Sequence, residues 1–366
     1  GEEPTEEDLI GVPVFCPKRG SVLDGIRHGA ALLKEETYKK KKLDGLCEVY
    51  RAAGKLYGEL RADAEARCAT DESLSEKLGE CLSRAGVADG AVRVYGTRKK
   101  YLLAAGEDRE GSKMTAPEFR ASVQECGGVR FGMPTYYRKG DTVLMECSGV
   151  RGFAVEAANV SRPKEPGDPC GDSFLSLETA DDRFFAILAD GMGTGRDAEA
   201  TSRFAVHFLG DLLAAGASRH TALRMLNLTL RERGIECGVT VDLFEFDLLT
   251  GEGQFIKCGA APSYIKRDES IFRIRSQTAP VGLMAKVDAE RIRVEVRSDD
   301  LIVLFSDGVS AAPEDTPWLP EKLAKPMRRE LAEYASDLLA CALKNEKPED
   351  DMSVAVLRIR RLPEAG

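Results

Sequence analysis

The stretch from Cys170 to Ala200 decides the fold, through CGDSF (170–174) and FFAILADGMGTGRDAEA (184–200). Its apolar run predicts a strand over 184–189 that ends at Asp190, so a carboxylate stands at the carboxyl end of the strand. Glycines alternate after it and allow a tight loop, and apolar residues then recur at helical spacing over 196–213. The aspartate therefore lies at a junction of strand, loop and helix.

Further acidic points flank predicted strands elsewhere. Asp307 follows the apolar run 301–305, Asp350 and Asp351 precede 352–359, and Asp172 precedes 173–177. A single Asp-Gly is first of all a turn signal. Four such junctions with no histidine beside them favour a site for hard divalent cations, Mg²⁺ or Mn²⁺, which prefer oxygen ligands. Two such ions would activate a water for attack on phosphorus.

The same residues carry a resemblance. GDSF, ADGMGTG, PSYIKR (262–267), SDGV (306–309) and DDMSVAV (350–356) occur in this order. The series resembles the signature of the PPM-type metal-dependent serine/threonine phosphatases, and within that superfamily it is most similar to the SpoIIE family. The similarity is specific over roughly residues 167–361. It implies an α+β fold in which two β-sheets lie between helices, the PPM phosphatase-type α-β-β-α sandwich, with metal ligands gathered at one edge.

The resemblance also implies roles for individual residues. Asp190 would bridge two Mn²⁺ or Mg²⁺ ions, and the carbonyl of Gly191 would hold the first of them. Asp307 and Asp350 would hold the second ion. Asp172 would act through waters on the metals, so Asp172 and Asp190 are the expected catalytic residues.

Two positions depart from the superfamily pattern. Asp351 stands where many PPM phosphatases have asparagine, so the resemblance leaves open whether Asp350 or Asp351 faces the metal. The arginine that clamps the phosphate in many of these enzymes has no clear counterpart, and Arg162 is the nearest candidate. Affinity for the substrate is therefore expected to come more from docking between proteins than from a phosphate pocket.

The predicted function is a metal-dependent protein serine/threonine phosphatase. Resemblance to the SpoIIE family implies that the substrate is a serine-phosphorylated anti-sigma-factor antagonist, a small STAS-domain protein. The alternative is a non-catalytic interaction module with a phosphatase fold, in which the acidic edge is vestigial. A nucleotide-binding loop at GMGTG is disfavoured, because no Walker lysine follows it.

The 366 residues, 43% of them hydrophobic, suffice for two or three domains. We expect an N-terminal arm and helical linker over 1–70, a small α+β regulatory domain over 71–152 and the phosphatase domain over 153–366. Within the phosphatase domain, tight turns predict a meander of hairpins over 239–275, and a helix is predicted over 326–344. Apolar residues recur at helical spacing within the linker, at Leu43, Leu46, Val49, Ala53, Leu56 and Leu60. The linker has too little core of its own and should dock on the next domain or pair in a homodimer. The order helix-strand-strand-helix-strand over 71–152 shows no catalytic constellation, so a structural spacer is an equal alternative to regulation.

Composition limits the partners and the location. The net charge of −9 and a pI near 5.2 argue against binding to nucleic acid. No apolar run is long enough to span a membrane. The ten cysteines form no C-x-x-C pair, so we expect them reduced in a cytoplasmic protein. Because the sequence begins with Gly and not Met, we expect it to be a fragment of a longer chain. This leaves open whether the protein is free in the cytoplasm or is the cytoplasmic part of a membrane-anchored protein.

Overall fold

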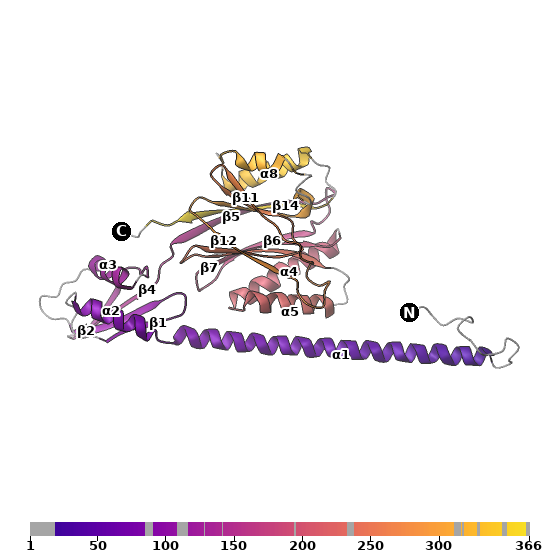
Figure 1. Cartoon of the computed structure of the whole chain (residues 1–366), viewed down its shortest axis with the longest axis horizontal. Coiled ribbons are helices and arrows are strands. Elements are labelled where there is room, and N and C mark those ends of the chain that lie inside the picture. Colours follow the sequence, from indigo (N-terminus) through magenta and orange to yellow (C-terminus); the bar gives the residue numbers. More distant parts are fainter. Residues whose placement is uncertain are drawn as a thin grey trace.

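A long helix, a four-stranded sheet and two stacked five-stranded sheets make up the molecule (Figure 1). The computed structural model describes residues 19–84, 91–107, 116–127, 129–140, 142–193, 195–232, 238–310, 316, 318–327, 330–345 and 350–363. The arm expected at the N-terminus lies, up to residue 18, outside the described residues. None of the described helices is long and apolar enough to cross a membrane.

The two five-stranded sheets are antiparallel throughout. The first has the order β12-β9-β8-β7-β6 and is built from β6 (Asp172–Glu178), β7 (Arg183–Gly191), β8 (Val239–Asp247), β9 (Glu252–Cys258) and β12 (Glu290–Glu295). The second has the order β11-β10-β13-β14-β5 and is built from β5 (Phe153–Arg162), β10 (Ser263–Arg267), β11 (Ser270–Ile274), β13 (Leu301–Phe305) and β14 (Met352–Arg361).

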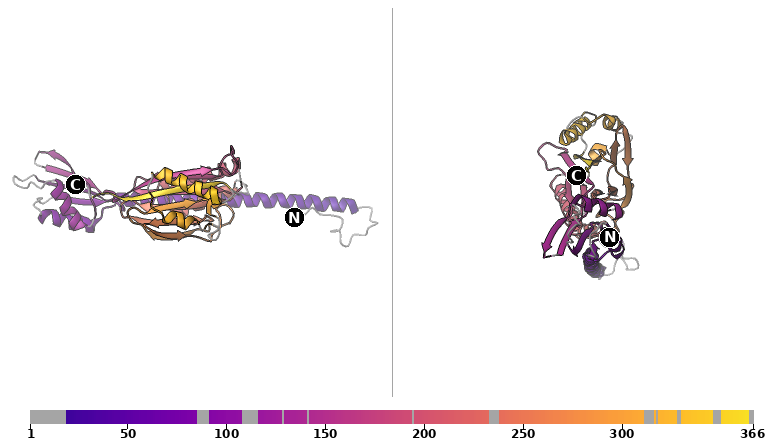
Figure 2. Two further views of the ribbon diagram at one scale, coloured as in Figure 1. Left: turned by 90° about the horizontal axis from the view of Figure 1, so that it is seen from above. Right: turned by 90° about the vertical axis from the view of Figure 1, so that its left-hand side faces the viewer.

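Three apolar cores hold the layers together. Alternate residues of β8 point to opposite faces, so Leu243 packs under α4 (Arg196–Ala214) and α5 (Arg219–Glu232), while Phe244 packs between the sheets. Helix α8 (Leu331–Asn345) covers the outer face of the second sheet through Leu338. The predicted α-β-β-α sandwich is thereby confirmed (Figures 1 and 2).

A buried ion pair within the first sheet is linked to the second sheet by a hydrogen bond. Lys257 of β9 is fully buried, and its Nζ lies 2.5 Å from Oδ2 of Asp242 on β8. The same Nζ donates to the hydroxyl of Ser263 on β10 at 2.7 Å. Because the two sheets share this charged contact, their relative position depends on a polar group inside an otherwise apolar layer.

Most predicted elements of the sandwich are confirmed within a few residues, with two corrections. The strands predicted over 239–275 were expected to form one meander of hairpins, but β9 and β10 lie in different sheets, so the chain crosses the sandwich between them. The helix predicted over 326–344 begins only at Leu331, and the short helices α6 (Asp307–Ser310) and α7 (Trp318–Ala324) precede it. Local periodicity does not reveal which sheet a strand joins.

The N-terminal linker is one continuous helix, α1 (Arg19–Cys68), of 50 residues. At about 1.5 Å per residue it is about 75 Å long, and it extends well past the sandwich (Figure 1). It docks antiparallel on α5: Gly45 lies beside Glu232, and the carboxylate of Glu59 accepts a hydrogen bond of 2.7 Å from the hydroxyl of Thr221. The docking partner is therefore the sandwich, and not, as expected, residues 71–152, the next domain along the chain.

The face of α1 that docks differs in part from the face predicted by spacing. Ala52 and Leu56 are buried, whereas Leu46, which the spacing placed on the apolar face, is 47% exposed. Tyr50 and Tyr57 are exposed as well, at 69% and 74%. The helix therefore keeps apolar side chains that α5 does not cover.

Residues 72–148 form a separate layer of two helices on a sheet, with its own core of Leu78, Leu102 and Phe119. Its elements are α2 (Glu72–Arg84), β1 (Ala91–Tyr95), β2 (Tyr101–Glu107), α3 (Ala116–Gly127), β3 (Thr135–Lys139) and β4 (Thr142–Ser148), with the sheet order β1-β2-β4-β3. Strand β3 was missed because all five of its residues are exposed and show no alternation. Cys81 is disulfide-bonded, so the expectation of reduced cysteines is wrong for this residue.

Candidate metal centre

The topology brings the four acidic junctions to one edge of the sandwich. Asp172 and Asp190 are directly paired across β6 and β7 in the first sheet. Asp307 follows the C-terminal end of β13 after Ser306, and Asp350 precedes β14 by way of Asp351; β13 and β14 are antiparallel neighbours in the second sheet. Asp190 is close enough to the other three carboxylates to be affected by their charges. The structure therefore gathers the four aspartates that the sequence singled out.

At two positions of this edge, Gly191 and Gly308, the neighbouring backbone leaves no room for a Cβ atom. A Cβ on Gly191 would lie 2.2 Å from the carbonyl oxygen of Ala198 in the first turn of α4. A Cβ on Gly308 would lie 2.1 Å from the carbonyl oxygen of Asp351. Neither contact leaves room for a side chain, so both Asp-Gly pairs mark a close approach of backbones, not simply a turn. The close approach at Gly191 brings the start of α4 to the edge, and the close approach at Gly308 brings the backbone of Asp351 beside Asp307.

Crowding of negative charge dominates the electrostatics of the edge. Burial, with the nearby charges of Asp172, Asp307 and Asp350, raises the pKa of Asp190 to about 9. Burial and the charge of Asp350 also raise the pKa of Asp307. The Asp190 and Asp307 carboxyl groups lie within hydrogen-bonding range of each other. Such a cluster strongly favours positive charge, from protons or from cations.

Asp172 is the most buried of the four, at 6% exposure. Neither of its carboxylate oxygens has a hydrogen-bond partner within the described part of the chain. The nearby Ser306 hydroxyl accepts from the N–H of Ser353 at 2.8 Å, and the Ser353 hydroxyl donates to Ser161. Burial, with the charges of Asp351 and Asp307, raises the pKa of Asp172 to about 7, against the opposite effect of the nearby Ser353 and Ser306 hydroxyls, which form no hydrogen bond of good geometry with it. A buried carboxylate without partners is costly unless a ligand satisfies it.

The donor chemistry of the edge fits Mg²⁺ or Mn²⁺. All candidate ligands are carboxylate oxygens or the Gly191 carbonyl, and the orphaned oxygens of Asp172 add acceptors for water. Among the described residues, no three His, Cys, Asp or Glu side chains surround one point closely enough to enclose an ion.

Asp351 has a structural role that Asp350 does not share. It is 4% exposed, and its Oδ1 and Oδ2 accept hydrogen bonds from the backbone N–H groups of Lys164 (2.6 Å) and Gly171 (2.5 Å). Both oxygens are thus used to hold the loop between β5 and β6, directly before Asp172. Asp350 contributes negative charge at Asp190 and Asp307 instead. We call these two hydrogen bonds of Asp351 the latch. The sequence does not predict the latch, because its donors are backbone groups about 180 residues away.

Arg162, the nearest candidate for a phosphate clamp, also reaches this edge. It is the last residue of β5 and pairs in register with Met352, next to Asp351. Helix α4 begins close to the edge as well, since the loop from Gly191 to Gly195 leads directly into it.

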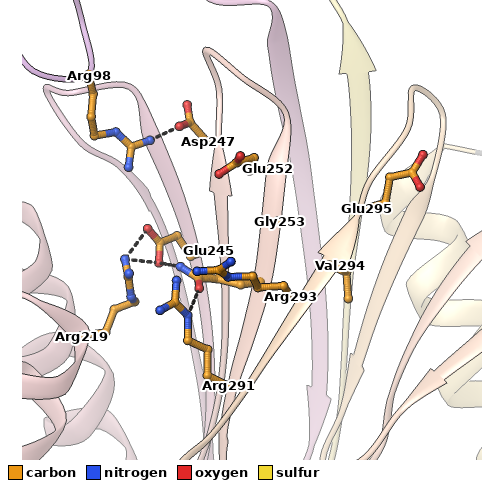
Figure 3. A pocket seen from close by; sticks show the side chains of 11 residues that line it. Arg98, Arg219, Glu245, Asp247, Glu252, Gly253, Arg291, Arg293, Val294 and Glu295 are labelled. Atoms are coloured by element: carbon orange, nitrogen blue, oxygen red, sulfur yellow. Dashed lines mark hydrogen bonds and ion pairs between the residues drawn. The ribbon is translucent and has the colours of Figure 1, made fainter.

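A charged hollow of about 600 Å³ lies at the other end of the first sheet (Figure 3). Its residues Glu245 and Asp247 are at the end of β8 remote from the acidic edge, because Asp247 pairs with Arg183 at the start of β7. Arg219 donates to Glu245 at 2.7 Å, and Arg98 of the small domain forms an ion pair with Asp247. Arg98 and Arg219 thus have acidic partners, and the Arg98–Asp247 pair joins the small domain to the sandwich at this hollow.

Comparison with known proteins agrees with this architecture. The chain superimposes on the PP2C phosphatase domain and regulatory-domain fragment of the cell fate determinant SpoIIE from Bacillus subtilis, with a TM-score of 0.70 and 20% identity. That match covers 89% of this chain and 98% of the other. A serine/threonine phosphatase of S. agalactiae matches 56% of the chain at a TM-score of 0.50 and 17% identity. At these identities the matches establish the fold, which is that of the PP2C-type (PPM) serine/threonine phosphatases.

Sequence comparison is more specific. Residues 180–360 match the family model of stage II sporulation protein E (SpoIIE). The stage II sporulation protein E of Bacillus subtilis (strain 168) is 25% identical over 297 residues, and that of Priestia megaterium is 22% identical over 364 residues. These alignments cover 78% and 94% of this chain but only 36% and 62% of the relatives. The family model thus matches just under half of the chain, and the expected resemblance to the SpoIIE family is confirmed over residues 180–360.

Proposed function

We propose that the chain is a metal-dependent protein serine/threonine phosphatase of the SpoIIE type. Its substrate is a serine-phosphorylated anti-sigma-factor antagonist, a STAS-domain protein. The observation that carries the proposal is the convergence of Asp172, Asp190, Asp307 and Asp350 at one edge of a PP2C-type sandwich, with the oxygens of Asp172 buried and unpartnered. Such a cluster adds nothing to folding and suits cation-assisted attack on a phosphate monoester.

The roles follow from position at the edge. Asp190, on which the charges of the other three carboxylates act, would be a ligand of both cations, and the Gly191 carbonyl would be a ligand of one of them. Asp307 and Asp350 would hold the second cation from the other sheet. When bound, Mn²⁺ or Mg²⁺ supplies positive charge to the phosphate and lowers the pKa of the attacking water. Because the ligands come from both sheets, the packing of the two sheets fixes the distance between the two cation positions.

Asp172 and Arg162 act on water and substrate. The unpartnered oxygens of Asp172 accept hydrogen bonds from water at the edge and so orient it. Arg162, at the end of β5 and paired in register with Met352, is the candidate to bind a phosphate oxygen.

Replacement of the bridging carboxylate tests the proposal. Asp190→Asn should abolish Mn²⁺-dependent hydrolysis of p-nitrophenyl phosphate and of the phosphoprotein, because one bridge between the cations is lost. Its melting temperature should not fall, because a neutral amide relieves the crowding that raises the pKa of Asp190. Near-normal turnover in this variant would end the two-metal mechanism. Lack of hydrolysis by the unaltered protein would favour the alternative, a non-catalytic interaction module with a phosphatase fold.

We further propose that the chain forms a homodimer through α1, in a cytoplasmic setting and without nucleic acid. The support is the apolar surface that α5 leaves uncovered on α1, including Tyr50 and Tyr57. The location is either a free cytoplasmic protein or the cytoplasmic part of a membrane-anchored one. Sedimentation should show a dimer for the unaltered chain and a monomer for the double variant Tyr50→Ser/Tyr57→Ser.

A further inference from the structure

Three large apolar side chains lie exposed beside the loop that follows Asp190. Met192, Leu283 and Met284 are 43%, 46% and 54% exposed. A Cβ on Gly238 would lie 2.7 Å from Cγ of Leu283 and 2.8 Å from Sδ of Met192, so these two side chains meet above Gly238. Single exposed apolar residues are ordinary, but a contiguous group beside a reaction site indicates binding.

The exposure of these side chains does not come from a loose loop. Asn227 of α5 is 2% exposed, accepts from the N–H of Gly282 at 2.8 Å and donates to the carbonyl of Met284 at 3.1 Å. Val281 and Val239 exchange two backbone hydrogen bonds of 2.9 and 2.8 Å. A buried amide is thus used to fix a backbone whose apolar side chains face solvent. The loop presents Leu283 and Met284 in a defined place.

The position of Met192 beside the acidic edge indicates which kind of molecule covers this surface. Met192 directly follows Gly191, and its N–H donates to the carbonyl of Gly238 at 3.0 Å. A phosphoserine side chain is short, so a protein that brings one to the acidic edge must place its own surface over Met192. Methionine is flexible and polarizable, and it is enriched in interface cores, where it adapts to an irregular partner.

We propose that Met192, Leu283 and Met284, together the apolar rim, are the docking surface for the folded protein that carries the phosphoserine. This inference rests on the proposed phosphatase function and adds to it the residues that select a protein over a small phosphate ester. It assigns substrate affinity to the loop held by Asn227, outside the carboxylate cluster.

The test is Leu283→Ser/Met284→Ser, with Phe272→Ser as the matched control. Phe272 is 48% exposed but lies on β11, the edge strand of the second sheet. Three probes are compared with Mn²⁺: a serine-phosphorylated STAS-domain protein, a short phosphopeptide from it, and p-nitrophenyl phosphate. The double variant should raise KM for the phosphoprotein at least about tenfold, the effect of losing one energetic hot spot. For the two small probes, and for the control variant, kcat/KM should stay within about twofold.

Other outcomes overturn the inference in distinguishable ways. An unchanged KM for the phosphoprotein refutes docking at the rim, and so does an equal loss on all three probes, which would mean that the rim only shapes the edge. A change in sedimentation with unchanged KM would show that a second copy of the chain covers the rim. A second variant, Asn227→Ala, should weaken phosphoprotein hydrolysis in the same selective manner. If the unaltered protein hydrolyses no probe, the phosphatase function itself fails, and the docking role fails with it.

Discussion

Asp350 and Asp351 are neighbours with opposite expected responses to substitution. Asp351→Ala removes the acceptor of two backbone N–H groups, those of Lys164 and Gly171. A hydrogen bond to a charged group contributes about 1.5–3 kcal/mol, and an orphaned buried donor costs about 1–3 kcal/mol. We therefore expect Asp351→Ala to lower the free energy of unfolding by about 3 kcal/mol. Asp351→Asn keeps one acceptor and should lose about half as much. Asp350→Asn removes a charge that crowds Asp190 and Asp307, so stability should hold or rise.

Urea denaturation and p-nitrophenyl phosphate hydrolysis over a Mn²⁺ titration separate the two residues. Asp350→Asn should lose Mn²⁺-dependent turnover while its unfolding midpoint stays the same or increases. Asp351→Asn should unfold at lower urea and retain turnover, since the carboxylates on the metal edge are intact. The reverse pattern, with a stable and inactive Asp351→Asn and an active Asp350→Asn, would refute the assignment of Asp351 as a latch and Asp350 as a ligand.

Three other predictions follow from the same contacts. Removal of residues 1–70 should change kcat or Mn²⁺ affinity severalfold without unfolding the rest, because α1 docks on α5; identical kinetics would make α1 a tether only. Without cations, stability should fall as the pH rises from about 4 towards 9, because folding raises the pKa of Asp190 to about 9 and the folded state then binds more protons than the unfolded chain. Added Mn²⁺ should therefore raise the melting temperature more at pH 8 than at pH 6, as calorimetry would show. Lys257→Met should destabilise by about 3–5 kcal/mol because it leaves Asp242 buried without its cation, and Asp242→Leu/Lys257→Met should lose clearly less.

The sequence predicted the parts of the site that depend on local pattern. Apolar runs located β7 and β13 closely, and the aspartates at their ends were identified from those boundaries. What it could not predict are contacts with backbone groups distant in sequence, such as the bonds from Lys164 and Gly171 to Asp351. The crossing between β9 and β10 was missed for a related reason, since strand period shows that a strand exists and not which sheet it joins. The glycines were found, but their reason, close approach of backbones, needed the fold.

Helix α5 links the two features that the sequence did not show to be connected. At its N-terminal turn, Thr221 donates to Glu59 of α1, and one turn and a half further along Asn227 holds the loop that carries Leu283 and Met284. A change in how α1 sits on α5 would therefore reach the apolar rim through a rigid element, without passing through the carboxylates. Since α4 begins directly after the glycine loop and packs on α5, the same change would also reach Gly191. Docking of the substrate and placement of the metal ligands thus both depend on the position of α5. Changes in α1 should therefore alter KM and kcat together.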